Sequence, residues 1–269
     1  MKAFDAVKYA AGLLKRAAIE DAHFEARLLV EKAVGFSPQA HPDCELDSEA
    51  ELTLDALVKR RVSHEPLQYV LGEWEFMALP FYVSPAALIP RPETELLCMY
   101  AVDRIRLRGM KRVLDLCCGT GCIGVSLAVH TGASCDFSDI SSEALELARL
   151  NAARHGVQGR FLLGDLFEPV SDSYDLIIAN PPYLDYVDMA KLQPELRFEP
   201  SLALYGGGDG LDVFRGIAAH YKEHLAPNGA LLMEIGYKQA RAITGLFEGC
   251  VIDTDYSGQP RIAIVEDIC

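Results

Sequence analysis

The segment VLDLCCGTGCIGVSL, residues 113–127, decides the fold class of this chain. An apolar run passes into a glycine-rich turn and then into a pattern typical of a helix. Gly119, Gly121 and Gly124 spell G-x-G-x-x-G, and Asp139 follows Gly119 by 20 positions. In a βαβ unit this spacing places a carboxylate opposite the turn, where it holds the hydroxyl groups of a ribose. The segment therefore predicts a crevice for a nicotinamide or flavin dinucleotide or for S-adenosylmethionine.

Short apolar runs alternate with helix-length intervals from about residue 93 onward. The runs are Val113–Leu116, Ser134–Phe137, Phe161–Leu163, Leu176–Ala179, Ala230–Met233 and Ile262–Val265. Runs without polar alternation indicate strands that are covered on both faces, as in a parallel sheet. We predict an α/β fold with a doubly wound, Rossmann-like sheet.

The chain before this region has a different pattern of apolar residues. Its first part has apolar residues at helical spacing, and Asp47 and Ser48 have the pattern of a helix start. β-favouring runs then surround Gly72 and several prolines, which predicts a β-hairpin. The expected organisation is a small all-α N-terminal domain (1–65), a hairpin connector (66–90) and a large α/β domain (91–269).

Three residues favour S-adenosylmethionine over a dinucleotide. Asp115 lies inside the apolar run before the turn, where amides of the turn or the ammonium group of a methionine would satisfy a buried carboxylate. Asp165 ends the run GRFLLGDLF, where an adenine amino group needs an acceptor, and Leu166 offers the base an apolar side chain and a backbone amide. Asp165 is explained equally well as the N-cap of a following helix.

The segment YDLIIANPPYLD, residues 174–185, predicts the group that is modified. An apolar run ends at Asn180, Pro181, Pro182 and Tyr183, and the two prolines prevent the backbone from continuing as sheet or helix. The amide oxygen of Asn180 and the carbonyl oxygen of Pro181 are two acceptors, and Tyr183 offers a flat face. Together they suit a planar NH₂ group, so the sequence predicts methylation of an amino or amide nitrogen.

Composition excludes several classes of protein. Half of the 269 residues are apolar, as in globular proteins, and the formal net charge of −14 argues against broad electrostatic binding of nucleic acid. No stretch is apolar enough to span a membrane. The eight cysteines form no disulfide framework, so we expect reduced thiols in a cytoplasmic protein. A metal site at Cys117, Cys118 and Cys122 is the minor alternative, because no histidine stands nearby at ligand spacing.

Further motifs resemble a known family. They are PLQYVLGEWEF (66–76), LIPRPETE (88–95), SDISSEALELARLNA (138–152), GDLFEP (164–169), FEPSLALYGGGDGL (198–211) and LLMEIGYKQ (231–239). With the glycine turn and NPPY, their order resembles the class I S-adenosylmethionine-dependent methyltransferases that modify the N5 atom of glutamine in peptide chain release factors. The resemblance implies direct in-line transfer to the glutamine of a Gly-Gly-Gln loop, S-adenosylhomocysteine as product, and a helical domain that docks the release factor.

Matching this chain to the family's motifs implies roles for individual residues. The cofactor would be held by Cys117, Cys118, Gly119, Thr120, Gly121, Asp139, Asp165, Leu166 and Asn180. The substrate would be held by Asn180, Pro181, Pro182 and Tyr183, with Asn180, Pro181 and Tyr183 as the catalytic groups. We expect no metal, no direct binding of nucleic acid, no membrane association and a monomer.

One departure and three motifs leave alternatives open. Cys117 stands where the family usually has glycine, so we expect a backbone conformation there that accepts a Cβ atom. LIPRPETE is either the rigid start of a helix capped by Thr94 or a cover of the cofactor site through Arg91 and Thr94. The glycines at 206–210 form a flexible loop or lie near the substrate entrance, and Glu234 is expected to be structural.

Other functions fit parts of the sequence. A DNA adenine N6-methyltransferase would use the same clamp on a flipped base, but the acidic charge and the lack of a basic reading helix disfavour it. A nicotinamide-dependent oxidoreductase would explain the glycine turn and leave NPPY unexplained. A binding module that has lost catalysis has only Cys117 in its favour.

Overall fold

The computed structural model describes residues 1–266. The chain forms two compact units. The first comprises Met1–Glu73 with Gln193–Phe198, and the second comprises Trp74–Leu192 with Glu199–Cys269. None of the helices within the described residues is long and apolar enough to cross a membrane.

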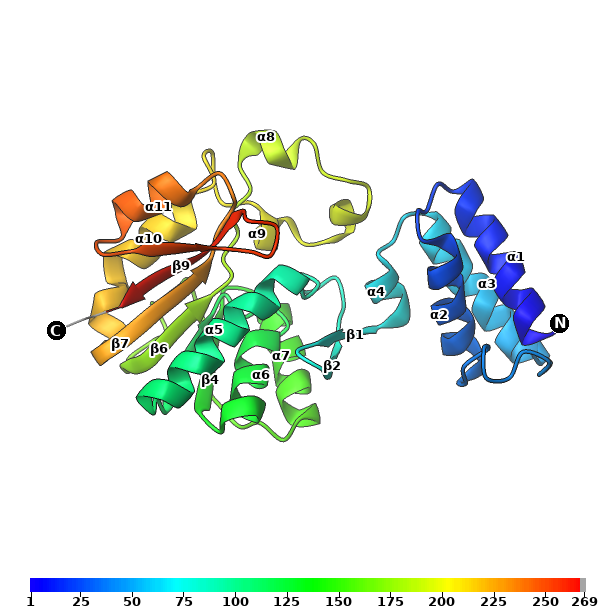
Figure 1. The fold of residues 1–269 in the computed structure, drawn as a ribbon, viewed down its shortest axis with the longest axis horizontal. Helices are drawn as coiled ribbons and strands as arrows, with labels where there is room; N and C mark the ends of the chain where they lie inside the picture. The colour runs from blue at the N-terminus through cyan, green and yellow to red at the C-terminus, as the bar shows by residue number, and fades with distance from the viewer. Residues whose placement is uncertain (267–269) are drawn as a thin grey trace. The chain divides into compact units, whose positions relative to one another are not determined.

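The first unit is helical (Figure 1). Its elements are α1 (Ala3–Arg16), α2 (Ala22–Val34), α3 (Ser48–Val62), α4 (Leu67–Leu71) and the 3₁₀ helix η1 (Glu195–Phe198). The carboxylate of Asp47 caps α3 by accepting a hydrogen bond from the backbone N–H of Ala50 at 2.8 Å. This confirms the helix start that the sequence predicted there.

The hairpin is shorter than predicted. Residues 67–71, which were expected to be extended, form α4, and this helix ends at Gly72 with φ of 79°. The strands are β1 (Glu73–Phe76) and β2 (Leu79–Tyr82). Met77 and Ala78 form the turn between them with φ of 51° and 58°. Such a turn usually carries Asn-Gly, so Met77-Ala78 could not be recognised as a turn from its residues.

The second unit contains, within the described residues, a seven-stranded sheet in the order β5-β4-β3-β6-β7-β9-β8. Its strands are β3 (Arg112–Leu116), β4 (Ser134–Asp139), β5 (Phe161–Leu163), β6 (Tyr174–Ala179), β7 (Leu225–Glu234), β8 (Val251–Thr254) and β9 (Pro260–Glu266). From β5 to β7 neighbouring strands are parallel, as predicted. The prediction is wrong for β9, which pairs antiparallel with β7, because a strand covered on both faces reads as apolar in either direction. Strand β8, which the sequence did not predict, pairs antiparallel with β9.

Helices cover both faces of this sheet (Figure 1). One hydrophobic cluster includes residues of α5 (Pro92–Arg108), α6 (Cys122–Thr131) and α7 (Ser142–Arg154), and the other includes residues of α10 (Asp212–His220) and α11 (Ala240–Leu246). Along β6, Leu176 and Ile178 join the first cluster, whereas Ile177 and Ala179 join the second. The remaining short helices are α8 (Tyr186–Met189), α9 (Ser201–Leu204) and η2 (Tyr221–His224).

The order of the strands determines where a ligand binds. From β3 the chain moves to β4 and β5 on one side and then returns to β6 on the other side of β3. In open α/β sheets, ligands bind at the carboxyl ends of the strands where the direction of winding reverses. The segments after β3, β4, β5 and β6 carry the predicted site residues.

Asn151 of α7 joins the hairpin to the glycine turn. Its Oδ1 accepts from the backbone N–H of Tyr82 at 2.7 Å, and its Nδ2 donates to the carbonyl oxygens of Tyr82 at 3.0 Å and Thr120 at 2.9 Å. Asn151 is fully buried, and its bond to Thr120 is shielded from water, whereas the two bonds to Tyr82 are partly buried. The glycine turn is thereby held in place by Asn151, which lies outside the turn.

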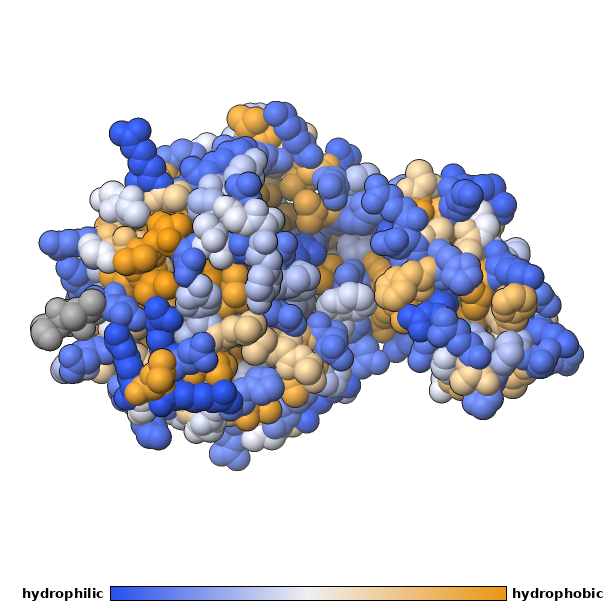
Figure 2. Space-filling view, viewed as in Figure 1, coloured by the Kyte–Doolittle hydropathy of each residue, from blue (hydrophilic) through white to orange (hydrophobic). Residues whose placement is uncertain are grey.

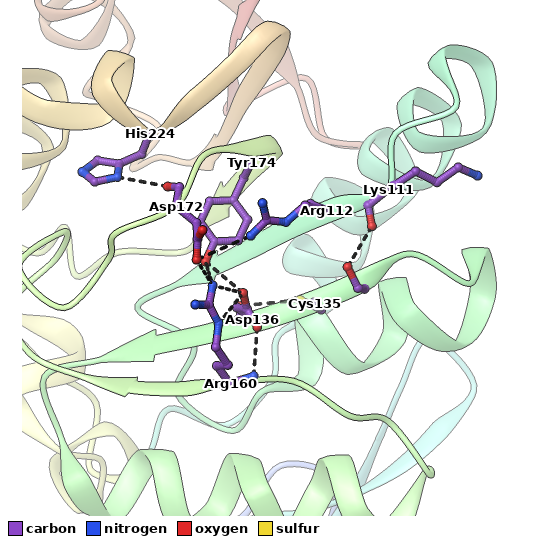
Figure 3. Close-up of polar contacts among 9 residues, drawn as sticks. Lys111, Arg112, Cys135, Asp136, Arg160, Asp172, Tyr174 and His224 are labelled. Carbon is purple, nitrogen blue, oxygen red and sulfur yellow. Dashed lines mark hydrogen bonds and ion pairs between the residues drawn. The ribbon is translucent and has the colours of Figure 1, made fainter.

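A polar cluster fastens the opposite ends of the strands (Figure 3). Arg160 lies before β5 and contacts Asp136 of β4 at 2.7 Å and Asp172 before β6 at 2.5 Å. The hydroxyl group of Tyr174, the first residue of β6, donates to Asp136 at 2.9 Å. Burial acts to raise the pKa of Asp136, but the hydrogen bonds from Arg160 and Tyr174 outweigh it and lower that pKa.

Candidate functional site

A cavity of about 1120 Å³, including its open mouth, lies at the carboxyl ends of the parallel strands. Of the predicted site residues, it is lined by Cys117, Cys118, Gly119, Thr120, Asp139, Asp165, Leu166, Asn180 and Pro182. Gly121, Pro181 and Tyr183 are not part of the lining. The structure thus brings most of the predicted residues, from four separate segments, to one cavity.

The glycine turn runs from the end of β3 to the start of α6. The backbone N–H of Gly119 donates to Oδ2 of Asp139 at 2.9 Å, and that of Cys118 donates to the carbonyl oxygen of Ser138 at 3.0 Å. Gly121 has φ of 73°, and a Cβ atom there would come within 3.0 Å of the Cβ of Ala148. Glycine is required at this position both by the conformation and by the close packing of α7.

Cys117 corrects an expectation. We expected a conformation suited to a residue with a Cβ atom, but φ of Cys117 is 57°, in the left-handed region that favours glycine. The backbone therefore keeps the shape of a glycine turn and holds a cysteine in it, at a cost of roughly 1–2 kcal/mol. Burial raises the pKa of the Cys117 thiol well above its ordinary value, so the side chain is a neutral part of the cavity wall.

Asp139, at the end of β4, has the position of a ribose-binding carboxylate. Its Oδ1 accepts from the backbone N–H of Ser141 at 2.9 Å, while Oδ2 accepts from Gly119. Burial raises the pKa of Asp139, and the hydrogen bonds from these two amides act in the opposite direction. A carboxylate has about four acceptor sites, so both oxygens retain capacity for the hydroxyl groups of a ligand.

Asp115 lies deeper, in β3, and does not line the cavity. The amide of Gly124 donates to its Oδ2 at 2.8 Å, which is the turn-amide partner that we expected. Its Oδ1 has no partner among the described residues. Burial raises the pKa of Asp115 well above its ordinary value.

Asp165 and Leu166 line the cavity after β5. The side chain of Asp165 is exposed and caps no helix within the described residues, so it is free to accept a hydrogen bond from a ligand. Leu166 has φ of 46°, and its carbonyl oxygen accepts from the hydroxyl group of Ser138 at 3.2 Å. Ile140 also lines the cavity and is 50% exposed; sequence reasoning missed it, because an apolar residue after a strand has no distinguishing pattern.

Asn180 stands at the end of β6 beside a buried pair of side chains. Its Nδ2 donates to Oγ1 of Thr94 at 3.0 Å, and Oγ1 of Thr94 donates to Oε2 of Glu234 at 2.6 Å. The hydroxyl group of Tyr183 donates to Oε1 of the same carboxylate at 3.2 Å. Burial raises the pKa of Glu234, whereas these two hydrogen bonds and the nearby Arg261 act to lower it.

The glycine loop at 206–210, whose role the sequence left open, and Gln239 hold the NPPY segment in place. The carbonyl oxygen of Tyr183 accepts from Nε2 of Gln239 at 3.1 Å, and the same Nε2 donates to the carbonyl oxygen of Gly210 at 2.9 Å. A Cβ atom at Gly210 would come within 2.4 Å of the Tyr183 carbonyl oxygen. The glycine loop therefore packs directly against the clamp. Gln239 was not singled out from the sequence, where nothing shows that its side chain turns back to Tyr183.

The LIPRPETE segment forms a wall of the cavity. Helix α5 begins at Pro92 with Arg91 as its N-cap, so the prediction that Thr94 caps the helix is wrong. Arg91 is paired with Glu199, whose Oε2 also accepts from the backbone N–H of Ile89 at 3.0 Å. Glu199 is 6% exposed and ties two distant walls of the cavity together. In the sequence, nothing distinguishes the single acid of the segment FEP as a residue with this role.

The donor set of the cavity fits S-adenosylmethionine. Asp139 has acceptor capacity that would suit ribose hydroxyl groups, Ile140 and Leu166 are apolar walls that would suit a planar base, and Asp165 is an acceptor that would suit its amino group. Within residues 1–266 no group of three or more His, Cys, Asp and Glu side chains is placed to hold a metal ion. The seven described cysteines are free thiols, and Cys269 lies outside the described residues.

Comparison with known proteins identifies the family. The family model "PrmC N-terminal domain" matches residues 5–72, and "Methyltransferase small domain" matches residues 94–195. The release factor glutamine methyltransferase of Geobacter sulfurreducens is 39% identical over 93% of this chain and 92% of its own length. The ribosomal protein uL3 glutamine methyltransferase of Bradyrhizobium diazoefficiens is 39% identical over 86% of this chain and 80% of its own length.

Solved structures agree on the fold. The T. thermophilus 16S rRNA N2 G1207 methyltransferase, solved with AdoMet and guanosine, superposes with a TM-score of 0.55 at 16% identity. The match covers 73% of this chain and 50% of that one. The similarity in sequence to the curated relatives extends over nearly the whole chain and includes both matched domains. The chain therefore belongs to the release factor glutamine methyltransferase family.

Proposed function

We propose that this protein transfers a methyl group from S-adenosylmethionine to the side-chain amide nitrogen of the glutamine in the Gly-Gly-Gln loop of peptide chain release factors. The observation that carries the proposal is the placement of Asn180. Its Nδ2 is bound to Thr94, its Oδ1 has no partner among the described residues, and the side chain lines the cavity. A free amide oxygen beside this cavity suits an incoming N–H group.

The reaction is demanding because an amide nitrogen is a poor nucleophile. When bound, S-adenosylmethionine would supply a methyl group on a positively charged sulfur, with S-adenosylhomocysteine as the product. Oδ1 of Asn180 and the carbonyl oxygen of Pro181 accept the two N–H groups of the glutamine amide. They hold the nitrogen lone pair in line with the methyl group, so that positioning and preorganised hydrogen bonds carry the rate. The nitrogen loses its extra proton to water after transfer, so no base has to act before the attack.

Individual site roles belong to the same proposal. The turn from Cys117 to Gly121, with Asp139, Asp165 and Leu166, holds the cofactor, and Asn180–Tyr183 holds the substrate. Support comes from the cavity, which most of these residues line. The helical residues 1–65 would dock the release factor. Apolar surface at α8, just after the clamp, supports a protein substrate, because Val187 in this helix is 54% exposed. Figure 2 shows hydrophobic atoms at the surface where Figure 1 places α8. We further propose that the protein works as a cytoplasmic monomer without a metal.

The test is transfer of labelled methyl from S-adenosylmethionine to four substrates offered in parallel. They are a release factor, the same factor with its Gly-Gly-Gln glutamine changed to alanine, ribosomal protein uL3, and duplex DNA. We expect label in the unchanged release factor alone. Label in uL3 but not in the release factor would move the substrate to the ribosomal protein, and label in DNA would overturn the proposal.

A further inference from the structure

The orientation of the Asn180 amide follows from the hydrogen bonds behind it. A hydroxyl group has a single hydrogen, and that of Thr94 is donated to Oε2 of Glu234. Oγ1 of Thr94 is therefore left with acceptor capacity only, and the group that faces it from Asn180 has to be the NH₂. The other end of the amide, Oδ1, is then directed away from Thr94.

Glu234 accepts at both of its oxygens. The hydroxyl group of Tyr183 donates to Oε1, while Thr94 donates to Oε2. Burial next to this carboxylate raises the pKa of Tyr183, which keeps its hydroxyl group a donor. Thr94 and Glu234 are each only 2% exposed, so water does not compete for these bonds. In its ionised form the Glu234 carboxylate only accepts, and in that form it sets the direction of the hydrogen bonds from Asn180 through Thr94.

We infer that Thr94 and Glu234 are positioning residues that fix the Asn180 amide with its oxygen directed to the substrate nitrogen. This inference rests on the proposed function and adds two residues to it. Neither residue needs to touch the reacting atoms. Their effect is to exclude the flipped amide, in which an NH₂ group would face the N–H groups of the glutamine and repel them.

Substitutions distinguish positioning from mere packing. Thr94→Val keeps the shape and removes the acceptor, so we expect kcat to fall about tenfold or more with the Kd of S-adenosylmethionine within threefold of its normal value. Thr94→Ser keeps the hydroxyl group and should restore most of kcat. Thr244→Val is the matched control, because Thr244 is an exposed threonine in helix α11. We expect no effect of this control on kcat.

Glu234→Gln tests the direction of the hydrogen bonds from Asn180 through Thr94 to Glu234. Its oxygen takes the hydrogen of Tyr183, so its NH₂ group faces Thr94 and forces the threonine hydrogen onto Asn180, which favours the flipped amide. We expect a loss of about 10- to 100-fold in kcat in the normal background. In the Thr94→Val background, where the hydrogen bonds from Asn180 through Thr94 to Glu234 are already lost, we expect a loss of less than threefold. A structural role for Glu234 would instead give the same loss in both backgrounds.

A second measurement needs no release factor. In ¹⁵N–¹H spectra the side-chain NH₂ signal of Asn180, identified by its absence in Asn180→Ala, should be protected from exchange by the bond to Thr94. Protection should be lost in Thr94→Val and Glu234→Gln and kept in Thr94→Ser. Unchanged protection in Thr94→Val, or equal kcat losses for Glu234→Gln in both backgrounds, would overturn the inference. If the normal enzyme fails to methylate release factors, the proposed function fails, and the NH₂ signal still decides the orientation.

Discussion

Replacing Asn180 by alanine separates the proposed chemistry from the fold. The substitution removes one preorganised acceptor, a loss that costs about 2.7–4 kcal/mol of transition-state stabilisation and 10²- to 10³-fold in kcat. On the structural side it removes one neutral hydrogen bond, from Nδ2 to Thr94 at 3.0 Å. That bond contributes about 0.5–1.5 kcal/mol to stability, because Thr94 keeps its bond to Glu234. Cofactor affinity should fall by no more than about tenfold, the loss of one such bond.

The assay measures kcat at saturating S-adenosylmethionine and release factor, beside the melting temperature and the Kd of the cofactor. We expect a loss of at least about 100-fold in kcat, and a fall of only a few degrees in the melting temperature. A kcat within tenfold of normal at saturating substrates would refute the clamp. A folded variant that no longer binds the cofactor would show instead that Asn180 acts mainly in cofactor binding.

Three further predictions concern the cofactor turn and the base of the sheet. Cys117→Gly should unfold at a higher temperature than Cys117→Val, because a β-branched residue is strained at φ of 57°; equal melting temperatures would argue against the left-handed conformation. Asp139→Ala should weaken binding of S-adenosylmethionine about 10- to 100-fold by calorimetry, since hydrogen bonds to a charged group contribute about 1.5–3 kcal/mol, and unaltered affinity would remove Asp139 from the ribose site. The pKa of Asp136 is lowered in the folded state, so its contribution to stability is present above the ordinary value of about 4 and is lost as the pH falls through the folded-state pKa. Urea unfolding over this pH range should show that Arg160→Leu loses less stability in acid than the unchanged protein. The same pH profile of stability in both proteins would contradict that role for Asp136.

The sequence predicted what depends on short stretches of chain. The glycine turn and Asp139 lie in one βαβ unit, and the structure joins them by a hydrogen bond from Gly119. NPPY ends a strand because proline cannot continue it. The direction and pairing of strands were harder to predict: β8 is an edge strand of only four residues, Val-Ile-Asp-Thr, which is too short to show a strand pattern of its own.

Bonds between distant segments could not be predicted. Thr94 and Glu234 are 140 positions apart, and Arg91 and Glu199 are 108 apart. Nothing in either local sequence shows which buried acid meets which donor, because that depends on how the helices pack on the sheet. The conformation of Cys117 was missed for a related reason: the surrounding turn, rather than the residue itself, sets its backbone angle.

The three hydrogen bonds of Asn151 bear on how short a catalytic fragment can be made. A fragment that starts at residue 91 would keep every predicted cofactor-binding residue, yet it would lack Tyr82, which both donates to and accepts from the Asn151 amide. A buried amide left without partners costs about 1–3 kcal/mol for each lost bond, and this amide also holds the carbonyl group of Thr120. The smallest autonomous catalytic piece should therefore begin before Trp74, so that the hairpin remains attached as an essential part of the cofactor turn.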